Sequence, residues 1–141
     1  MEQLIEFASN NMILAGIWLA LVAMLIYSYI STWTSSVKEV NTHEATLLIN
    51  KQDATVLDIR PVKDFRAGHI INARQIKPEE IREKNFKKLE NLKDKPIIVI
   101  CAMGNSARAT ATAMAKDGFS DVRILKGGMN AWQSASLPIS R

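Results

Sequence analysis

The feature that most constrains this chain is a long uncharged stretch near its N-terminus. No charged residue occurs between Glu6 and Lys38, and within this gap residues 12–30 read MILAGIWLALVAMLIYSYI. A helix needs about 20 apolar residues to cross the hydrocarbon core of a bilayer. The segment is apolar on all sides, which is typical of a membrane span or, as the alternative, of a fully buried core helix. We therefore predict a transmembrane helix over about 12–30.

A cleaved signal peptide is the main competitor of an uncleaved anchor. Signal peptides begin with a positively charged region and end at small residues, whereas this chain carries Glu2 and Glu6 and its apolar stretch ends in YSYISTW. An anchor is therefore favoured, with residues 1–36 as membrane anchor and connector. Basic residues follow the segment and none precedes it, so the positive-inside rule predicts that residues 37–141 face the cytoplasm. We expect a single-pass protein of the cell inner (plasma) membrane.

Residues 37–141 have the composition of a soluble domain in which strand-like and helix-like patterns alternate. Apolar runs predict buried strands at 54–59 and 97–100. Another strand is predicted at 122–125, a brief edge strand is expected at 37–40, and 70–76 is expected to hold a further short strand. Helices are predicted at 43–50, 62–67, 106–116 and 129–134, with another that begins at Pro78. Thr42 is the expected cap of the first helix, and Gly118 the expected left-handed cap after 106–116. This alternation predicts an α/β fold with a parallel sheet flanked by helices.

The single cysteine, Cys101, lies between the predicted strand 97–100 and the predicted helix 106–116. Ligands of parallel sheets bind beyond the carboxyl ends of the strands, which is where this thiol stands. The small residues that follow allow backbone amides to turn toward one point, and the helix N-terminus adds positive potential. Both effects favour a thiolate and an anion bound beside it. We predict a reactive cysteine, and the alternative is a small inert core residue.

Three motifs in this order resemble those of the single-domain rhodaneses, a family of sulfurtransferases. The first comprises DIR at 58–60, DF at 64–65 and GHI at 68–70. The second is CAMGNS at 101–106, which is similar to the six-residue active loop of the family. The third comprises LKGGM at 125–129, AW at 131–132 and LP at 137–138. The resemblance covers about 39–139, and the preceding anchor resembles a group of bacterial membrane-bound rhodanese-like proteins.

The resemblance implies a sulfurtransferase that works through a covalent intermediate. Cys101 would take the outer sulfur of thiosulfate or of a persulfide donor and pass it to a thiol or cyanide, with ping-pong kinetics. Asp58 and Arg60 would support the site as an ion pair, and no metal or organic cofactor is implied. The implied substrate-binding residues form one run: Ala102, Met103, Gly104, Asn105, Ser106, Ala107 and Arg108.

The active loop departs from the many family members that carry Arg or Lys there. Ala102, Met103 and Ser106 are uncharged, so weak thiosulfate binding is expected and the natural donor could instead be a protein persulfide. Arg108, just past the loop, either compensates or is a solvated helix residue. The neutral loop leaves open a second function, a catalytically weak, membrane-tethered binding module for a membrane protein partner.

Two further function classes are disfavoured. Cysteine phosphatases carry a Cys-x5-Arg loop, but position 107 is Ala and Arg108 falls one residue late. Nucleic-acid binding is not expected, since no zinc-ligand spacing and no interleaving of aromatic with basic residues occurs. The excess of basic residues over 82–95 fits either a solvated helix face or attraction to anionic lipid headgroups.

Overall fold

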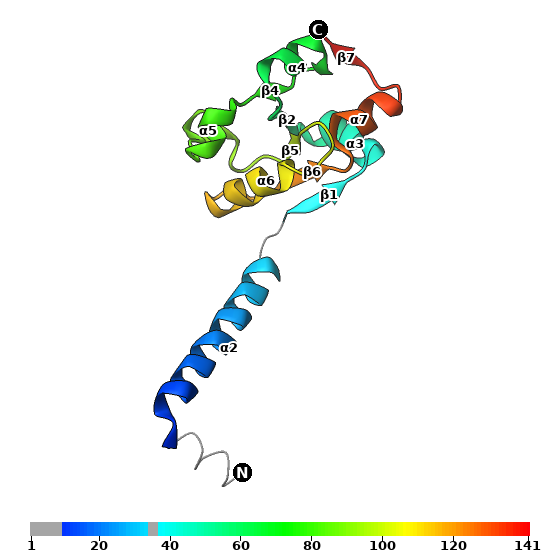
Figure 1. Ribbon diagram of the computed structural model, residues 1–141. Coiled ribbons are helices and arrows are strands. Elements are labelled where there is room, and N and C mark those ends of the chain that lie inside the picture. Colours follow the sequence, from blue (N-terminus) through cyan, green and yellow to red (C-terminus); the bar gives the residue numbers. More distant parts are fainter. Residues whose placement is uncertain (1–9, 34–36) are drawn as a thin grey trace. The chain divides into compact units, whose positions relative to one another are not determined.

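The computed structural model describes residues 10–33 and 37–141, with side chains described over 10–27 and 37–141. The chain divides into two compact units, Met1–Ser35 and Ser36–Arg141. In the first unit, helix α2 (Met12–Trp33) is continuous, and most of its described large apolar side chains, such as Ile13 and Trp18, are exposed (Figure 1).

The predicted membrane span over 12–30 is not confirmed. Within the described parts of the chain, no helix was found that is both long enough and apolar enough to cross a membrane. The last positions of the predicted span, 28–30, lie beyond the described side chains of α2, and positions 34–36 of the predicted connector lie outside the described residues.

The second unit contains a five-stranded sheet in the order β1-β6-β5-β2-β4, and every neighbouring pair is parallel. Its strands are β1 (Lys38–Val40), β2 (Thr55–Asp58), β4 (Arg74–Gln75), β5 (Ile97–Ile100) and β6 (Val122–Leu125). The helices are α3 (Thr42–Gln52), α4 (Val62–Ala67), α5 (Pro78–Arg82), the 3-10 helix η1 (Lys87–Leu92), α6 (Ala107–Lys116) and α7 (Gly128–Ser134). This arrangement confirms the predicted α/β fold with a parallel sheet flanked by helices.

Two apolar cores lie on the two faces of the sheet, because alternate residues of a strand point to opposite faces. Ile97 and Val99 of β5 pack in the core that contains residues of η1 and α6, such as Met114. Ile98 and Ile100 pack in the other core, which contains residues of α3 and α7, such as Trp132. Figure 1 shows α6 on one side of the sheet and α3 with α7 on the other. Burial on both faces explains why β5 is apolar throughout.

The segment 70–76 holds the short strand β4, as expected, but Ile70 at its start belongs to a different strand. Its residues form two short strands in different sheets: Ile70 belongs to β3 (His69–Ile70), which pairs antiparallel with β7 (Ile139–Ser140), whereas β4 pairs with β2. A turn separates the two, with Asn72 in the left-handed region at φ 62°. Asparagine tolerates that conformation better than most residues. The C-terminal strand β7 has no counterpart in the sequence-based prediction.

The predicted helix cap is also corrected. The N-cap of α3 is Asn41, not Thr42, which is already helical. The Asn41 side chain accepts from the amide of Glu44 at 2.8 Å, and the Glu44 carboxylate accepts from the amide of Asn41 at 3.0 Å. This reciprocal pair is a capping box, which satisfies two amides that the helix leaves free.

Replacement of the true cap should lower stability more than replacement of the predicted one. We expect Asn41→Ala to cost about 1 kcal/mol of unfolding free energy, because an amide at the start of α3 loses its acceptor. The matched control is Thr42→Ala, which removes no cap bond. Urea unfolding followed by circular dichroism measures both, and equal losses in the two variants would contradict the assignment.

Candidate active site

Cys101 lies just beyond the carboxyl ends of two neighbouring strands. Asp58, the last residue of β2, pairs with Ile100, the last residue of β5, and the amide of Ile59 donates to the Ile100 carbonyl at 2.9 Å. Cys101 follows at once, and α6 begins at Ala107. The thiol therefore stands at the edge of the sheet where parallel α/β folds bind their ligands.

The sulfur of Cys101 is buried but surrounded by hydrogen-bond donors. The residue is only 4% exposed, and the Gly104 amide donates to its Sγ at 2.9 Å. Burial by itself would raise the thiol pKa. It is outweighed by hydrogen bonds from the Ser106 side chain and from the amides of Ala107, Gly104 and Ser106, so the pKa of Cys101 lies below its usual value. The groups that lower it are all uncharged.

The active loop (residues 101–106) is held in this shape by the start of α7. The amide of Met129 donates to the Cys101 carbonyl at 2.8 Å, and that of Asn130 to the Ala102 carbonyl at 3.1 Å. Because the carbonyls of Cys101 and Ala102 are bound to α7, the amides later in the loop, such as that of Gly104, face the sulfur.

Glycines permit this close approach of loop and helix. A Cβ on Gly128 would lie 2.3 Å from the Cys101 carbonyl oxygen, and one on Gly104 would lie 3.2 Å from the Gly127 nitrogen. Gly104, Gly127 and Gly128 all have positive φ, which only glycine adopts readily. The sequence contained a sign of this contact, because Gly127 and Gly128 belong to the LKGGM motif at 125–129, which resembles the family signature.

The predicted substrate-binding residues that follow Cys101 differ in how exposed they are. Ala102, Met103, Asn105 and Ser106 are exposed, Gly104 is half-buried, and Ala107 is buried in the first turn of α6. Arg108 forms an ion pair with Glu39 of β1. The structure thus gathers Gly104, Ser106 and Ala107 around the sulfur and binds the Arg108 guanidinium to β1.

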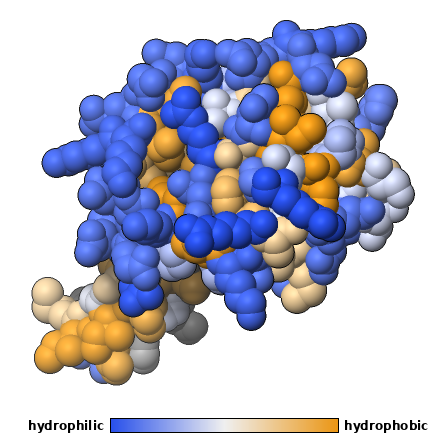
Figure 2. Space-filling view, turned by 90° about the horizontal axis from the view of Figure 1, so that it is seen from above, coloured by the Kyte–Doolittle hydropathy of each residue, from blue (hydrophilic) through white to orange (hydrophobic). Residues whose placement is uncertain are grey.

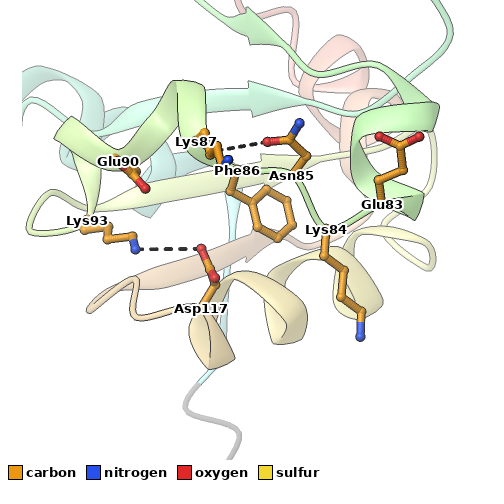
Figure 3. Close-up of a pocket in the computed structure, with 8 residues that line it drawn as sticks. All are labelled: Glu83, Lys84, Asn85, Phe86, Lys87, Glu90, Lys93 and Asp117. Atoms are coloured by element: carbon orange, nitrogen blue, oxygen red, sulfur yellow. Dashed lines mark hydrogen bonds and ion pairs between the residues drawn. The ribbon is translucent and has the colours of Figure 1, made fainter.

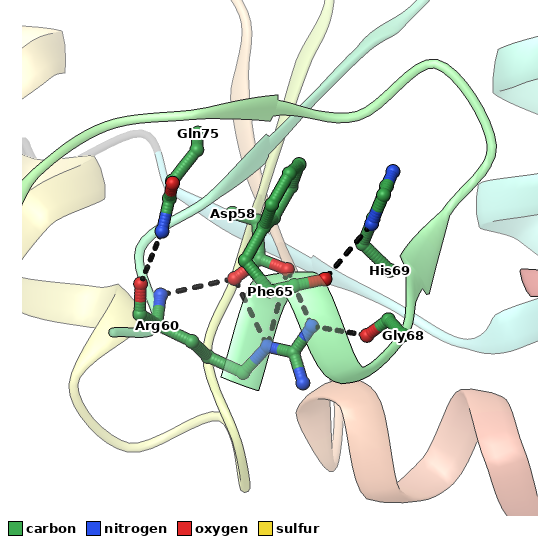
Figure 4. A network of polar contacts seen from close by, with 6 residues as sticks. All are labelled: Asp58, Arg60, Phe65, Gly68, His69 and Gln75. Carbon is green, nitrogen blue, oxygen red and sulfur yellow. Dashed lines mark hydrogen bonds and ion pairs between the residues drawn. The ribbon is translucent and has the colours of Figure 1, made fainter. Parts of the chain in front are cut away.

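A network of hydrogen bonds around Arg60 holds the segment that follows β2 in place (Figure 4). The buried Arg60 guanidinium donates to both carboxylate oxygens of Asp58, the shortest contact being 2.7 Å, and to the Gly68 carbonyl at 2.8 Å. The Gln75 side chain donates to the Arg60 carbonyl at 3.0 Å. His69 stacks on Phe65, with ring centroids 3.9 Å apart, and its Nδ1 donates to the Phe65 carbonyl. Asp64 forms no ion pair with any described residue.

Two pockets differ in their relation to the thiol. One, of about 240 Å³, lies beside the loop and is lined by Arg60, Asp64, Ala67, Gly68, Ala102, Met129, Asn130 and Gln133. The other, of about 380 Å³, includes Phe86 and charged residues such as Lys93 and Asp117, the latter at the opposite end of α6 from Cys101 (Figure 3). Among the described residues, no cluster of His, Cys, Asp and Glu could hold a metal ion.

A parallel α/β sheet with a thiol held in a loop of amides before a helix defines the class: a domain of rhodanese fold with a candidate cysteine nucleophile. Residues 41–135 match the rhodanese-like domain family, and the chain belongs to that family.

Three relatives illustrate the similarity. The uncharacterized protein YibN of Escherichia coli (strain K12) is 39% identical over 141 residues, covering 100% of this chain and 99% of that protein. Thiosulfate sulfurtransferase GlpE of Pseudomonas putida (strain GB-1) is 35% identical over 100 residues, covering 71% of this chain and 88% of GlpE. The crystal structure of a rhodanese-related protein from Thermoplasma volcanium has a TM-score of 0.62 and 32% identity, covering 73% of this chain and 97% of that one.

The hydrogen bond from Ser106 predicts a pH effect on thiol reactivity. The lowered pKa of Cys101 means that alkylation by iodoacetamide should reach half its maximal rate at a lower pH than for free cysteine. Ser106→Ala should move this midpoint to higher pH, because the thiolate loses a donor while the cost of burial remains. The control is Ser134→Ala on the exposed end of α7, and a midpoint that is the same in both variants would contradict the assignment.

Proposed function

We propose that this protein is a membrane-anchored sulfurtransferase of the rhodanese type, in which Cys101 carries the sulfur as a persulfide. The observation that carries the proposal is the buried Sγ of Cys101, which accepts the Gly104 amide at 2.9 Å and has a lowered pKa. An inert core cysteine has no need of donors turned toward it. The similarity to GlpE, a thiosulfate sulfurtransferase, supports the same chemistry.

The proposed reaction has two half-steps. The Cys101 thiolate attacks the outer sulfur of thiosulfate, the sulfur–sulfur bond breaks, and sulfite leaves with the electron pair. Cyanide or an acceptor thiolate then attacks the outer sulfur of the persulfide. The bond to Cys101 breaks, and the thiolate returns with its electron pair, where the Gly104 and Ala107 amides stabilise it. No external oxidant or reductant is required, because the outer sulfur moves at the same oxidation level.

The neutral loop bears on the choice of donor. Ala102, Met103, Asn105 and Ser106 bring no positive charge, and Arg108 is bound to Glu39. Within the loop, a dianion such as thiosulfate would therefore meet main-chain amides and the start of α6, and no charged side chain of the loop would hold it. We propose that thiosulfate serves as a poor donor and that a persulfide serves as a better one.

The test is the formation of a sulfur adduct on the full chain. After incubation with thiosulfate, intact mass spectrometry should show one added sulfur atom, and cyanide should remove it with release of thiocyanate. Cys101→Ser should show neither, while Ser134→Ala should behave as the wild type. If no donor, including glutathione persulfide, produces an adduct, the domain is a binding module and not an enzyme.

The anchor and its location form the second part of the proposal. We propose that α2 holds the protein in the cell inner (plasma) membrane with residues 37–141 in the cytoplasm. The support is the apolar run over 12–30, with Tyr27 and Tyr29 at its C-terminal end and Trp33 just beyond it, and the basic residues that begin at Lys38. The match to YibN extends over the whole chain and so includes this segment.

Charges placed in the apolar segment should release the protein from membranes. Each Arg at the centre of a spanning helix costs roughly 2.5–3.5 kcal/mol of insertion free energy, so Leu19→Arg with Ala23→Arg should shift the protein to the soluble fraction. The control places the same charges at exposed apolar sites of the domain, Leu47→Arg with Ile71→Arg. Unchanged membrane sedimentation of the first variant would refute the anchor. Digestion of the domain by protease added outside spheroplasts would refute the orientation.

A further inference from the structure

We propose that the surface around the active loop docks an acidic protein segment that carries the donor persulfide. This inference rests on the proposed function and specifies its donor. The docking surface is defined by Met103 at its centre and by Lys63 and Lys126 on its two sides.

The centre of this surface is apolar. Met103 is 63% exposed, more than any other large apolar side chain of residues 37–141. It stands two residues after Cys101, in a loop that has no charged residue. Methionine is enriched at protein–protein interfaces, where its flexible side chain adapts to a partner. A small hydrated anion makes no use of such a side chain, whereas a polypeptide covers it.

The two lysines flank this centre because of the strand order. β5, which leads to Cys101, lies between β6 and β2 in the sheet. Lys126 follows β6 directly, and Lys63 lies in the first turn of α4, shortly after β2. Lys126 lies close to the loop, because a Cβ on Gly104 would lie 3.4 Å from the Leu125 carbonyl oxygen and 3.2 Å from the Gly127 nitrogen. Lys63 belongs to α4, whose Asp64 and Ala67 line the same pocket as Ala102 of the loop. Both side chains are exposed, and among the described residues neither forms an ion pair.

The acidic groups at this edge are largely neutralised. Asp58 is bound to Arg60, and Glu39 is bound to Arg108. Asp64 of α4 is the nearby acid without an ion pair among the described residues, and Arg66 of the same helix, also unpaired there, offsets it. The rim therefore has a net positive charge and complements an acidic partner.

This edge is also far from the point where the chain enters the domain. β1 begins at Lys38 and runs parallel to β6, so residue 37 lies at the amino edge of the sheet. Cys101 lies at the carboxyl edge. An exposed apolar side chain with charged residues around it resembles the centre and rim of a protein interface. Figure 2 shows hydrophobic and hydrophilic groups side by side on one face of the molecule.

In the docked state the Cys101 thiolate attacks the outer sulfur of the partner's cysteine persulfide. The sulfur–sulfur bond of the partner breaks, its own cysteine leaves as a thiolate with the electron pair, and the persulfide forms on Cys101. The acidic flanks of the donor make contact with Lys63 and Lys126 but take no part in the transfer.

The test uses two synthetic peptides that carry the same cysteine persulfide, one flanked by glutamates and the other by lysines. With the full chain at low salt, we expect the glutamate-flanked peptide to load Cys101 at least about tenfold faster, because complementary charge accelerates encounter. The advantage should shrink as salt is added. Lys63→Glu with Lys126→Glu should remove or reverse the preference.

The matched control is Lys51→Glu, an exposed lysine near the end of α3 at the opposite edge of the sheet, which should keep the wild-type preference. The maximal rate of alkylation by neutral iodoacetamide, reached at high pH where the thiol is fully ionised, should equal the wild-type rate in all variants, which verifies an intact loop. Equal loading by the two peptides, or a preference that survives the double reversal, would overturn the docking surface alone. Absence of any sulfur adduct from either peptide or from thiosulfate would overturn the proposed function and the docking surface together.

Discussion

A buried thiolate is unfavourable unless hydrogen bonds replace the water that it loses. In this domain the compensation comes from main-chain amides and one hydroxyl around Cys101, so the conformation of residues 101–107 determines the reactivity of the sulfur. That conformation in turn depends on α7, whose first amides bind the loop carbonyls. Gly128 permits the contact, because any side chain there would collide with the Cys101 carbonyl. The loop and the helix that follows β6 therefore form one structural unit.

The ion pair between Asp58 and Arg60 has a comparable role on the other side of the thiol. The pair is buried, and a buried pair is costly to break because the remaining charge loses its partner. The Arg60 guanidinium donates to the Gly68 carbonyl, and the Arg60 carbonyl accepts from the Gln75 side chain. These two hydrogen bonds join the end of β2 to the segments around β3 and β4. Its contribution is to fix the edge beside Cys101, while the groups that lower the thiol pKa lie within residues 104–107.

Particular elements show how far the sequence could predict this structure. β5 and β6 were predicted at their observed bounds, and the start of α5 at Pro78 was also predicted, because short runs of mostly apolar residues and a proline at a helix start are local signals. The cap of α3 was misplaced by one residue because Asn41 and Thr42 are both capping residues. Glu44 three positions after Asn41 was the signal that distinguishes them. The segment 70–76 could not be divided locally, since β3 pairs with β7 some seventy residues later in the chain.

The sequence alone determined the alternation of the principal strands and helices, the place of the single cysteine between a strand and a helix, and the uncharged segment that precedes the domain. These follow from the periodicity and chemistry of neighbouring residues. Only the tertiary structure decided that the loop rests on Gly128 and that Arg108 binds Glu39 on β1. Each of these joins residues far apart in the chain, and such contacts depend on how the sheet brings its strands together, which no local pattern contains.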